Sequence, residues 1–486
     1  MRKILFLIMF VLSALTIEAA KGSSYDEPYR PQYHFSPEKG WIGDPSGLTY
    51  YLGKYHLFWW GKAVSTDLVH YEQITPNVMR NTPAGMSNFT GSMVIDKHNT
   101  AGWGTNAWIA VMTVYEQDSK KQAQGIAFSH DGENFYHYDQ NPVLDLWSTE
   151  FRDPTVFWHE PTRKWIMVVA KAREKKVQFY SSTNLKEWIW ESDFGPSGNQ
   201  EKAWECPDLF LVPVNGDWND RKWVLLTSIN WAQEQYFIGD FDGHKFTLMD
   251  NHPAEPFLVD RGLDYYASRV FRDYDGTLRN AISMGWLATW DYAPLAPSAW
   301  GKGFWSVPRI YNLKSFKEGM RLTQQPIEEL KTLRGKPFRL AGKIPVGAKP
   351  LKGFSPKSNA YELDAVFDAR VENTYGFYLC KGQGHQTIIS YDTRSHTLLI
   401  DRTNSSDVEI PKFKRIAQTE VYPENGKLRL HIYVDKSSIE IFTNQGKEVF
   451  SLLTYAGDAQ TGIETFALRP GTWMQLNAWT LDSIWK

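Results

Sequence analysis

Short runs rich in Val, Ile, Tyr, Phe and Trp fill residues 31–309, and pairs such as Asp131-Gly132 and Asn215-Gly216 separate them. This spacing is typical of antiparallel strands joined by tight turns. Five landmark segments recur in this region at intervals of about 50 to 60 residues, close to the repeat of a four-stranded propeller blade. The sequence therefore predicts an all-β fold that starts with a five-bladed β-propeller. The landmarks are residues 41–44, 89–92, 152–153, 204–205 and 264–266.

The last third of the chain predicts a second all-β unit. Residues 326–334 have the apolar spacing of one short helix. Farther on, apolar residues alternate with other residues over 428–434, as they do in a half-buried strand. We therefore expect the propeller over residues 25–320, a linker with the short helix over 321–336 and a β-sandwich over 337–486.

The first residues have the pattern of an export signal. Met1-Arg2-Lys3 precedes an apolar run over 4–15, and the small pair Ala19-Ala20 suits a cleavage site. The apolar run is too short to span a bilayer. Residues 1–20 are therefore predicted to be a signal peptide, which implies export to the periplasm or beyond and no membrane insertion once the signal is removed.

Charge and cysteine content exclude several classes of partner. A net charge of −2 provides no field that would attract nucleic acid or acidic lipid, so we expect an uncharged substrate. The two cysteines, Cys206 and Cys380, lie too far apart in sequence to suggest a disulfide framework. Metal-ligand spacings and phosphate-binding loops are absent from the sequence, which predicts no metal and no other cofactor. The sequence leaves the oligomeric state open.

Three acidic residues each precede a proline at the edge of a hydrophobic stretch. They are Asp44, Asp153 and Glu205, and they fall in three different blade repeats. A single Asp-Pro pair is more often a turn, but the innermost strands of different blades converge on one central cavity. We expect each strand to stop at its proline, which cannot donate to a ladder. Because hydrolysis of a sugar acetal or ketal needs one ionised and one protonated carboxyl group, the chain is predicted to be a glycosidase.

The motifs around these carboxylates resemble a known family. They read Trp-Ile-x-Asp-Pro-x-Gly from Trp41, Phe-Thr-Gly-Ser from Phe89, Phe-Arg-Asp-Pro from Phe151, Trp-Glu-Cys-Pro-Asp-Leu-Phe from Trp204 and Asp-Tyr-Tyr-Ala from Asp264. This set resembles glycoside hydrolase family 32, the invertases, inulinases and levanases. The resemblance extends to residues 61–70 and 434–442, so it spans nearly the whole mature chain.

The resemblance implies cleavage of β-fructofuranosyl linkages in fructans or fructo-oligosaccharides, of the levan, inulin or sucrose type. Asp44 would attack the anomeric C2 to form a covalent intermediate, and Glu205 would protonate the leaving oxygen and then activate water. Asp153, beside Arg152, would stabilise the transition state and is expected to stay ionised. The apolar face of Trp204 is expected to keep Glu205 protonated. Retention of configuration implies carboxyl groups of Asp44 and Glu205 about 5 to 5.5 Å apart.

Several side chains near these motifs are candidates for binding the sugar. An indole can stack on a sugar ring, although packing in a blade core is the simpler interpretation for most tryptophans. Simple strand packing is likewise the alternative for Phe89, Thr90 and Ser92, and ring closure for Trp286, Trp290 and Trp300 on the last blade. The candidate substrate-binding residues are Trp41, Trp60, Phe89, Thr90, Ser92, Arg152 and Trp286.

The chain departs from the family pattern where specificity is set. Relatives generally carry Asn before and after the first Asp-Pro, where this chain has Gly43 and Ser46. Phe58 leads directly into Trp59-Trp60-Gly61, where relatives insert a loop with a Gln and an Asn-Pro turn. A lost amide leaves a substrate hydroxyl without its partner, at a cost of about 0.5 to 1.5 kcal/mol.

Three interpretations follow from these departures. The protein remains a fructosidase with a wider groove, or its pocket suits another furanoside, as in the arabinan-cleaving five-bladed relatives. The third interpretation is a carbohydrate-binding protein that has lost catalysis, and the retained acidic triad argues against it. In each case the partner is an oligosaccharide or polysaccharide.

Overall fold

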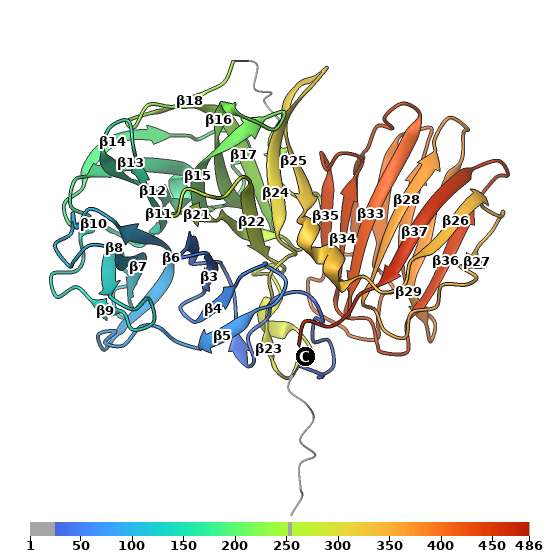
Figure 1. Cartoon of the computed structure of the whole chain (residues 1–486), viewed down its shortest axis with the longest axis horizontal. Helices are drawn as coiled ribbons and strands as arrows, with labels where there is room; N and C mark the ends of the chain where they lie inside the picture. The colour runs from blue at the N-terminus through green and yellow to red at the C-terminus, as the bar shows by residue number, and fades with distance from the viewer. Residues whose placement is uncertain (1–24, 251–254, 486) are drawn as a thin grey trace, which may run out of the picture.

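The computed structural model describes residues 25–250 and 255–485, so the predicted signal peptide lies outside the described residues. Two all-β units lie side by side in Figure 1, a five-bladed β-propeller and a C-terminal β-sandwich. The fold class predicted from the sequence is confirmed. In the described part of the chain, no helix is both long and apolar enough to cross a membrane.

The first three blades follow each other along the chain, each with its first strand innermost. Blade I also pairs in parallel with β21 (Arg272–Asp273) of blade V, which closes the ring, and blade II carries the short β9 (Tyr136–His137). The strands are β2 (Gly47–Tyr51), β3 (Lys54–Phe58), β4 (Lys62–Ser65) and β5 (Glu72–Thr75) in blade I; β6 (Met86–Asp96), β7 (Ala107–Glu116), β8 (Gln122–Ser129) and β10 (Leu144–Ser148) in blade II; and β11 (Phe151–His159), β12 (Lys164–Lys171), β13 (Lys176–Ser182) and β14 (Ile189–Phe194) in blade III.

The last two blades share one continuous sheet, because Val214 of blade IV pairs with Leu313 of blade V. Short strands also pair in this region. β19 (Phe257–Leu258) pairs with β17 of blade IV, and β1 (Gly40–Trp41) pairs in parallel with β23 (Gly301–Lys302). The main strands are β15 (Trp204–Val214), β16 (Asp217–Ile229), β17 (Gln233–Phe241) and β18 (Phe246–Leu248) in blade IV, and β20 (Tyr266–Val270), β22 (Ala281–Trp286), β24 (Arg309–Phe316) and β25 (Gly319–Pro326) in blade V.

The innermost strands share an irregularity at the landmark segments. Register shifts interrupt β6 near Asn88, β11 near Asp153, β15 near Cys206 and β20 near Ala267. The last three of these residues have positive φ values of 64°, 47° and 54°. Such bulges redirect side chains from a sheet toward a functional site. The prediction that these strands stop at their prolines is therefore wrong, since β11 and β15 continue past them and a bulge accommodates a residue without an N–H group.

Apolar residues on both faces of each blade form the propeller core. Ile109 and Val111 of β7 pack with Val156 of β11 and Met167 of β12 between blades II and III. Because a blade is covered by a neighbour on each side, its strands are near-continuous apolar runs. This packing fixes the angle between neighbouring innermost strands and so the shape of the central cavity.

The connection to the sandwich starts later than the sequence suggested. Residues 319–326 form β25, which pairs along its length with β24, whereas the linker was expected from residue 321. The expected helix is the short 3-10 helix η3 (Glu328–Leu333), whose Leu330 and Leu333 are buried. Two further 3-10 turns are η1 (Ala172–Glu174) and η2 (Ala293–Leu295).

Two six-stranded sheets form the sandwich around one apolar core. In the first sheet the order is β26 (Phe338–Lys343), β37 (Trp473–Thr480), β28 (Tyr361–Asp368), β33 (Lys427–Asp435), β34 (Ser438–Thr443) and β35 (Val449–Leu453). In the second it is β27 (Lys349–Pro350), β36 (Gly462–Ala467), β29 (Thr374–Gly382), β30 (His385–Asp392), β31 (Thr397–Asp401) and β32 (Ile416–Glu420).

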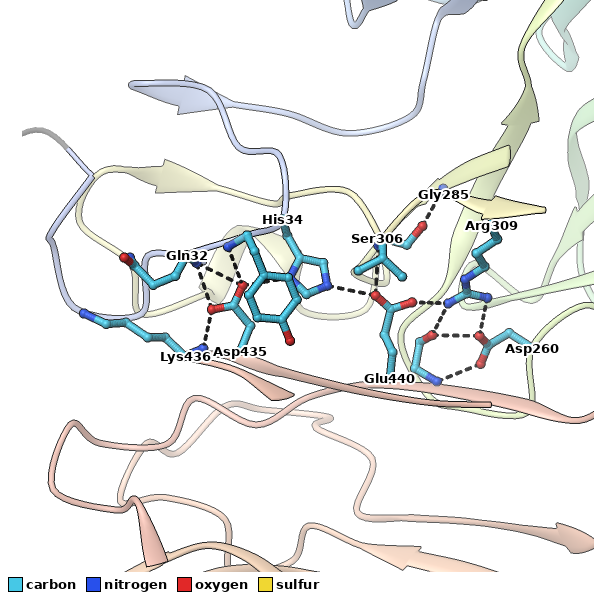
Figure 2. Close-up of polar contacts among 12 residues, drawn as sticks. Gln32, His34, Asp260, Gly285, Ser306, Arg309, Asp435, Lys436 and Glu440 are labelled. Atoms are coloured by element: carbon cyan, nitrogen blue, oxygen red, sulfur yellow. Dashed lines mark hydrogen bonds and ion pairs between the residues drawn. The ribbon is translucent and has the colours of Figure 1, made fainter. Parts of the chain in front are cut away.

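A buried polar network joins the two units, as Figure 2 shows. Arg309 of β24 is fully buried and binds Asp260 of the propeller at 3.0 Å and Glu440 of the sandwich. His34 lies between Asp435 and Glu440, at 2.8 Å from each carboxylate. Since each charged group meets an opposite charge, this interface fixes the sandwich against the propeller.

Candidate active site

A cavity of about 500 Å³ lies at the end of the propeller axis where the innermost strands begin. Asp44, Asp153 and Glu205 all line it. Asp44 lies three residues before the start of β2, and the other two carboxylates lie near the starts of β11 and β15. Residues far apart in sequence thus meet in one cavity, as the blade repeat predicted.

Cys206 ties two of the carboxylates together. Its Sγ lies 3.4 Å from Asp44 Oδ2 and 3.6 Å from Asp153 Oδ2, and its backbone N–H donates to Asp153 Oδ2 at 3.0 Å. Burial raises the pKa of the Cys206 thiol well above its usual value. The side chain is therefore a neutral thiol that donates to carboxylates, not a thiolate nucleophile.

Asp44 is held through one of its two oxygens. Thr90 Oγ1 donates to Oδ2 at 2.7 Å, whereas Oδ1 is buried and has no hydrogen-bond partner among the described residues. Burial raises the pKa of Asp44 to about 6, the Thr90 hydrogen bond opposes the shift, and the charge of Glu205 adds to it. One oxygen of this carboxylate is thus oriented by the protein, while the hydrogen-bonding capacity of the other is unused.

Asp153 departs from the expectation that its neighbouring guanidinium keeps it ionised. Its side chain is almost fully buried, and burial raises its pKa despite the charge of Arg152. The nearest guanidinium nitrogen lies 3.9 Å away, because Arg152 is turned toward Glu205. The carboxylates of Glu205 and Asp44 raise the pKa of Asp153 further. Burial therefore outweighs the effect of the Arg152 guanidinium on the pKa of Asp153.

Hydrogen-bond donors surround the carboxylate of Glu205, where the sequence predicted the indole of Trp204. Arg152 contacts its Oε1 through Nε at 2.9 Å and Nη2 at 2.8 Å, and the Tyr266 hydroxyl donates to its Oε2. Trp204 is fully buried, packs near Phe237 with ring centroids 5.9 Å apart, and lies outside the cavity lining. Successive side chains of a strand point to opposite faces, so the predicted shielding of Glu205 by Trp204 is wrong.

Arg152 organises one wall of the cavity. Besides Glu205, its guanidinium donates to Gln122 Oε1 at 3.1 Å and to Glu150 Oε2 at 2.8 Å. Arg173 in turn donates to Glu150 Oε1 at 2.7 Å. These contacts hold the Arg152 side chain in one position between the cavity and the outer surface of the blade.

Aromatic rings form the opposite walls. Trp41 is 40% exposed and stacks on Trp290 with ring centroids 5.7 Å apart and an interplanar angle of 23°. Phe89 stacks on Tyr115, and the Nε1 of Trp60 donates to the Phe89 carbonyl oxygen at 3.0 Å. Trp41, Trp60 and Phe89 line the cavity as predicted from the sequence.

Two predicted ligand residues lie outside the lining. Ser92 Oγ accepts the Val156 N–H at 2.9 Å, a contact between neighbouring innermost strands below the cavity. Trp286 ends β22, the second strand of its blade, and is fully buried next to Trp41 and Trp290. Ser92 therefore joins two blades, and Trp286 supports the aromatic wall from behind.

Five lining or supporting residues, Asn88 among them, were missed by the sequence analysis. Tyr266 belongs to the fifth landmark segment, so its position in the repeat was the signal that it reaches the axis. Trp290 was considered only for ring closure, whereas it lines the cavity. Gln122 and Glu150 also line the cavity, and no sequence motif indicated that they contact Arg152.

The residues on either side of Asp44-Pro45 and the short β3–β4 connection lie in the wall of the cavity. Gly43, Ser46, Trp59 and Trp60 all line it. A Cβ atom at Gly61 would lie 2.5 Å from the Trp59 ring, so the short β3–β4 connection needs glycine there. Trp59 and Trp60 are the residues of this short connection that line the cavity. Across residues 25–250 and 255–485, no group of three or more His, Cys, Asp or Glu side chains is arranged to hold a metal ion.

Comparison with known families decides the assignment. The model of the glycosyl hydrolases family 32 N-terminal domain matches residues 34–326, and that of the family 32 C-terminal domain matches residues 329–480. The chain belongs to glycosyl hydrolase family 32. The two matched domains correspond to the propeller and the sandwich, and they meet within the connection that carries η3.

Characterised members of family 32 resemble the chain over most of its length. A levanase of Bacillus subtilis is 38% identical over all of this chain and 75% of its own length. An extracellular exo-inulinase of Aspergillus ficuum is 32% identical over 90% of this chain and 92% of its own. The crystal structure of an exo-inulinase from Aspergillus awamori superposes with a TM-score of 0.85 at 30% identity, covering 95% of this chain and all of that one. The chain is thus a family 32 glycoside hydrolase in sequence and in fold.

Proposed function

We propose that this protein is an exported, retaining β-fructofuranosidase that acts on fructans or fructo-oligosaccharides of the levan, inulin or sucrose type. The observation that carries the proposal is the convergence of Asp44, Asp153 and Glu205 in one cavity at the propeller axis. The names of the similar proteins, levanase and extracellular exo-inulinase, support the substrate class and the export. The short apolar N-terminal run supports export independently.

Asp44 is the proposed nucleophile. Its Oδ1 lacks a partner in the part of the chain that the structure describes, and Thr90 fixes the orientation through Oδ2. In the first half-reaction one oxygen of the Asp44 carboxylate forms a bond to the anomeric C2 as the bond from C2 to the leaving oxygen breaks. The product is a covalent fructosyl-enzyme ester, and the charge of the carboxylate is consumed in forming it.

Glu205 is the proposed acid and base. It gives its proton to the leaving oxygen in the first half-reaction and removes a proton from water in the second, so the enzyme is regenerated. Arg152 and Tyr266 contact its two different oxygens, which fixes the plane of the carboxyl group. A substrate oxygen must compete with these contacts to receive the proton.

Asp153 is the proposed transition-state stabiliser. It lies deep in the cavity, next to Cys206 and within 3.9 Å of Arg152. A carboxylate there accepts hydrogen bonds from fructosyl hydroxyls and stabilises the positive charge that develops at C2. Trp41, Trp60 and Phe89 supply apolar surface for the uncharged sugar ring.

Hydrolysis of a polysaccharide panel tests the substrate class. We expect fructose or fructo-oligosaccharides from levan, inulin or sucrose, measured by chromatography of the products. Release of arabinose from arabinan with no fructose from any fructan would instead favour the second furanoside interpretation. Binding of fructans with no product from any of them would favour the carbohydrate-binding interpretation.

Two variants test the assigned roles. Glu205→Gln should lower kcat by a factor on the order of 10² or more, because the leaving oxygen loses its proton donor. In Glu205→Ala, added azide should restore turnover and yield a fructosyl azide with the configuration of the substrate, since Asp44 still forms the intermediate. A product of inverted configuration would contradict the double displacement.

A further inference from the structure

A second cavity of about 230 Å³ lies in blade II, near the same end of the propeller as the catalytic cavity. Met86, Val114 and Ala123 contribute its apolar surface, and Glu116, Lys121 and His137 contribute polar groups. Met86 starts β6 and Glu116 ends β7, which places the cavity beside the mouth of the active site. Its volume gives room for one sugar ring.

His137 presents an unsatisfied polar atom in this cavity. The side chain is 5% exposed, and its Nδ1 has no hydrogen-bond partner within residues 25–250 and 255–485. Its Nε2 lies 3.4 Å from Thr82 Oγ1. Burial lowers the pKa of His137, so the imidazole is neutral near pH 7. A buried polar atom without a partner is costly, so His137 is a lining residue whose hydrogen-bonding capacity is unused.

An exposed indole contacts Lys121, one of the residues that line the same cavity. Trp147 of β10 is 83% exposed, and Lys121 Nζ lies 4.3 Å from its ring centroid. Lys121 also lines the cavity and forms an ion pair with Asp145 at 3.1 Å. The backbone N–H of Trp147 donates to Asp145 Oδ1 at 2.7 Å, and the residue has a φ of 54°. The indole is thus held in a strained backbone position with one face on a cation and much of the rest open to solvent.

The blade II cavity and the catalytic cavity share a wall. Asn88 lines the catalytic cavity, and its Nδ2 donates at 3.0 Å to Thr82 Oγ1, the atom next to His137. Gln122 lines the catalytic cavity, whereas its neighbours Lys121 and Ala123 line the second one. Because successive side chains of a strand point to opposite faces, β8 serves both cavities at once.

We propose that the blade II cavity and Trp147 form a second carbohydrate-binding site, which holds a sugar unit of the same polymeric substrate outside the catalytic cavity. The chemistry favours an uncharged ligand with hydroxyl groups: His137 is neutral, Lys121 is paired with Asp145, and Glu116 accepts a hydrogen bond from Ser119. The indole supplies a flat apolar surface on which a sugar ring stacks. The identity of the sugar rests on the proposed function.

The site predicts a selective loss in Trp147→Ala. Turnover of sucrose, which is too short to reach both cavities, should stay within about twofold of the parent, whereas kcat/KM on levan or inulin should fall roughly tenfold through KM. The matched control is Trp190→Ala, since Trp190 is 56% exposed on β14 of the next blade. Equal kinetics of Trp147→Ala and the parent on both polymers would overturn the inference.

Binding is measured separately from turnover in the inactive Glu205→Gln background. Affinity electrophoresis in gels containing levan or inulin should show retardation that Trp147→Ala weakens and Trp190→Ala does not. A shift of the His137 imidazole NMR signals on addition of a fructo-oligosaccharide should accompany binding. Sucrose turnover with no retardation by either polymer would overturn the second site and leave the proposed function intact. Absence of turnover on sucrose and on every fructan would overturn both.

Discussion

The two oxygens of Asp44 have different surroundings, and this asymmetry decides what the residue can do. Oδ2 accepts the Thr90 hydroxyl and lies near the Cys206 thiol, while the buried Oδ1 lacks a partner in the described part of the chain. A nucleophile must be held in a fixed orientation toward the reacting carbon, and the Thr90 contact supplies that orientation. The cost of this arrangement is visible in the pKa of Asp44, which burial raises to about 6.

The first prediction concerns Thr90→Val. The Thr90 hydroxyl favours the charged form of Asp44, so its removal should raise the pKa of Asp44 above about 6. Because only the ionised carboxylate attacks, the acid limb of kcat/KM should move to higher pH, by roughly 0.5 to 1 unit for one neutral hydrogen bond. The pH profile of sucrose hydrolysis checks this. Thr90→Ser keeps the hydroxyl and should keep the limb in place, and an unmoved limb in Thr90→Val would refute the effect.

A second prediction at Asp44 concerns stability. The pKa of Asp44 is about 6 in the folded protein and has an ordinary value of 3.8. Protonated Asp44 therefore favours the folded state, and this contribution to stability is lost as the pH rises through 6. Asp44→Asn should therefore be inactive and yet more stable than the parent at pH 7, by up to about 3 kcal/mol.

Urea unfolding at two pH values measures this stability difference. The gain should be present near pH 7 and should disappear as the pH falls below 3.8, the ordinary pKa, because Asp44 is then protonated in both states. Asp220→Asn, an exposed position on β16, serves as the control and should change little at either pH. A stability loss in Asp44→Asn at pH 7 would show that the carboxylate is not destabilised by burial.

The carboxylates were predictable from the sequence, and their surroundings were not. Asp44, Asp153 and Glu205 each carry a local motif in phase with the blade repeat, so topology alone brings them together. The contact of Glu205 with Tyr266 joins two blades and depends on the bulges, which no local pattern marks. The prediction that Trp286 binds the sugar was wrong because tryptophan is common both in apolar cores and in sugar-binding cavities. Its position on the second strand of the blade, which places it in the core, could not be read from the sequence.

At the scale of secondary structure, the bulges of the innermost strands place the catalytic side chains. The same irregularity recurs in β6, β11, β15 and β20 at the level of the cavity. The sequence indicated the strands from their apolar runs, but it suggested that the prolines end them. Proline has no backbone N–H group to donate to a neighbouring strand, and both a bulge and a strand end tolerate this. The sequence therefore cannot distinguish a proline in a bulge from a proline at a strand end.

The third prediction concerns Gly91, next to the bulge of β6. A Cβ atom there would lie 2.0 Å from the Val111 carbonyl oxygen of β7, so Gly91→Ala must push two paired strands apart. We expect a loss of stability of about 1 to 3 kcal/mol and a larger loss of activity, since Phe89 and Thr90 move with the strand. Thermal unfolding and sucrose hydrolysis measure the two effects.

The control for Gly91→Ala lies in the sandwich. Gly342 of β26 has no heavy atom within 4 Å of an added Cβ, so Gly342→Ala should leave stability and activity nearly unchanged. If Gly91→Ala unfolded at the parent's temperature with full activity, the close approach of β6 and β7 would not constrain the site.

At the scale of the whole molecule, buried charges join propeller and sandwich (Figure 2). His34 and Arg309 belong to the propeller, and Glu440 of the sandwich binds both. The carboxylates Asp435 and Glu440 raise the pKa of His34 to about 9 against the opposing effect of burial, and Arg309 and His34 lower that of Glu440 to about 2. Both partners are therefore charged near neutral pH, and the docking of the two units depends on pH.

The fourth prediction follows from the signs of these shifts. The contribution of His34 is fully present below its ordinary pKa of 6.5 and is lost as the pH rises through about 9. That of Glu440 is present above its ordinary pKa of 4.5 and is lost as the pH falls toward 2. The melting temperature should therefore be highest between about pH 4.5 and 6.5 and should decline toward pH 9.

His34→Gln isolates the alkaline part of this dependence. The variant should lose up to about 3 kcal/mol at pH 6, and the difference from the parent should shrink toward pH 10, where His34 is neutral anyway. His98→Gln, an exposed histidine after β6, is the matched control and should follow the parent curve. Scanning calorimetry across this range makes the comparison. Parallel curves for His34→Gln and the parent would mean that the imidazole is uncharged in the folded protein, and the interface would then be held by Arg309 and apolar packing instead.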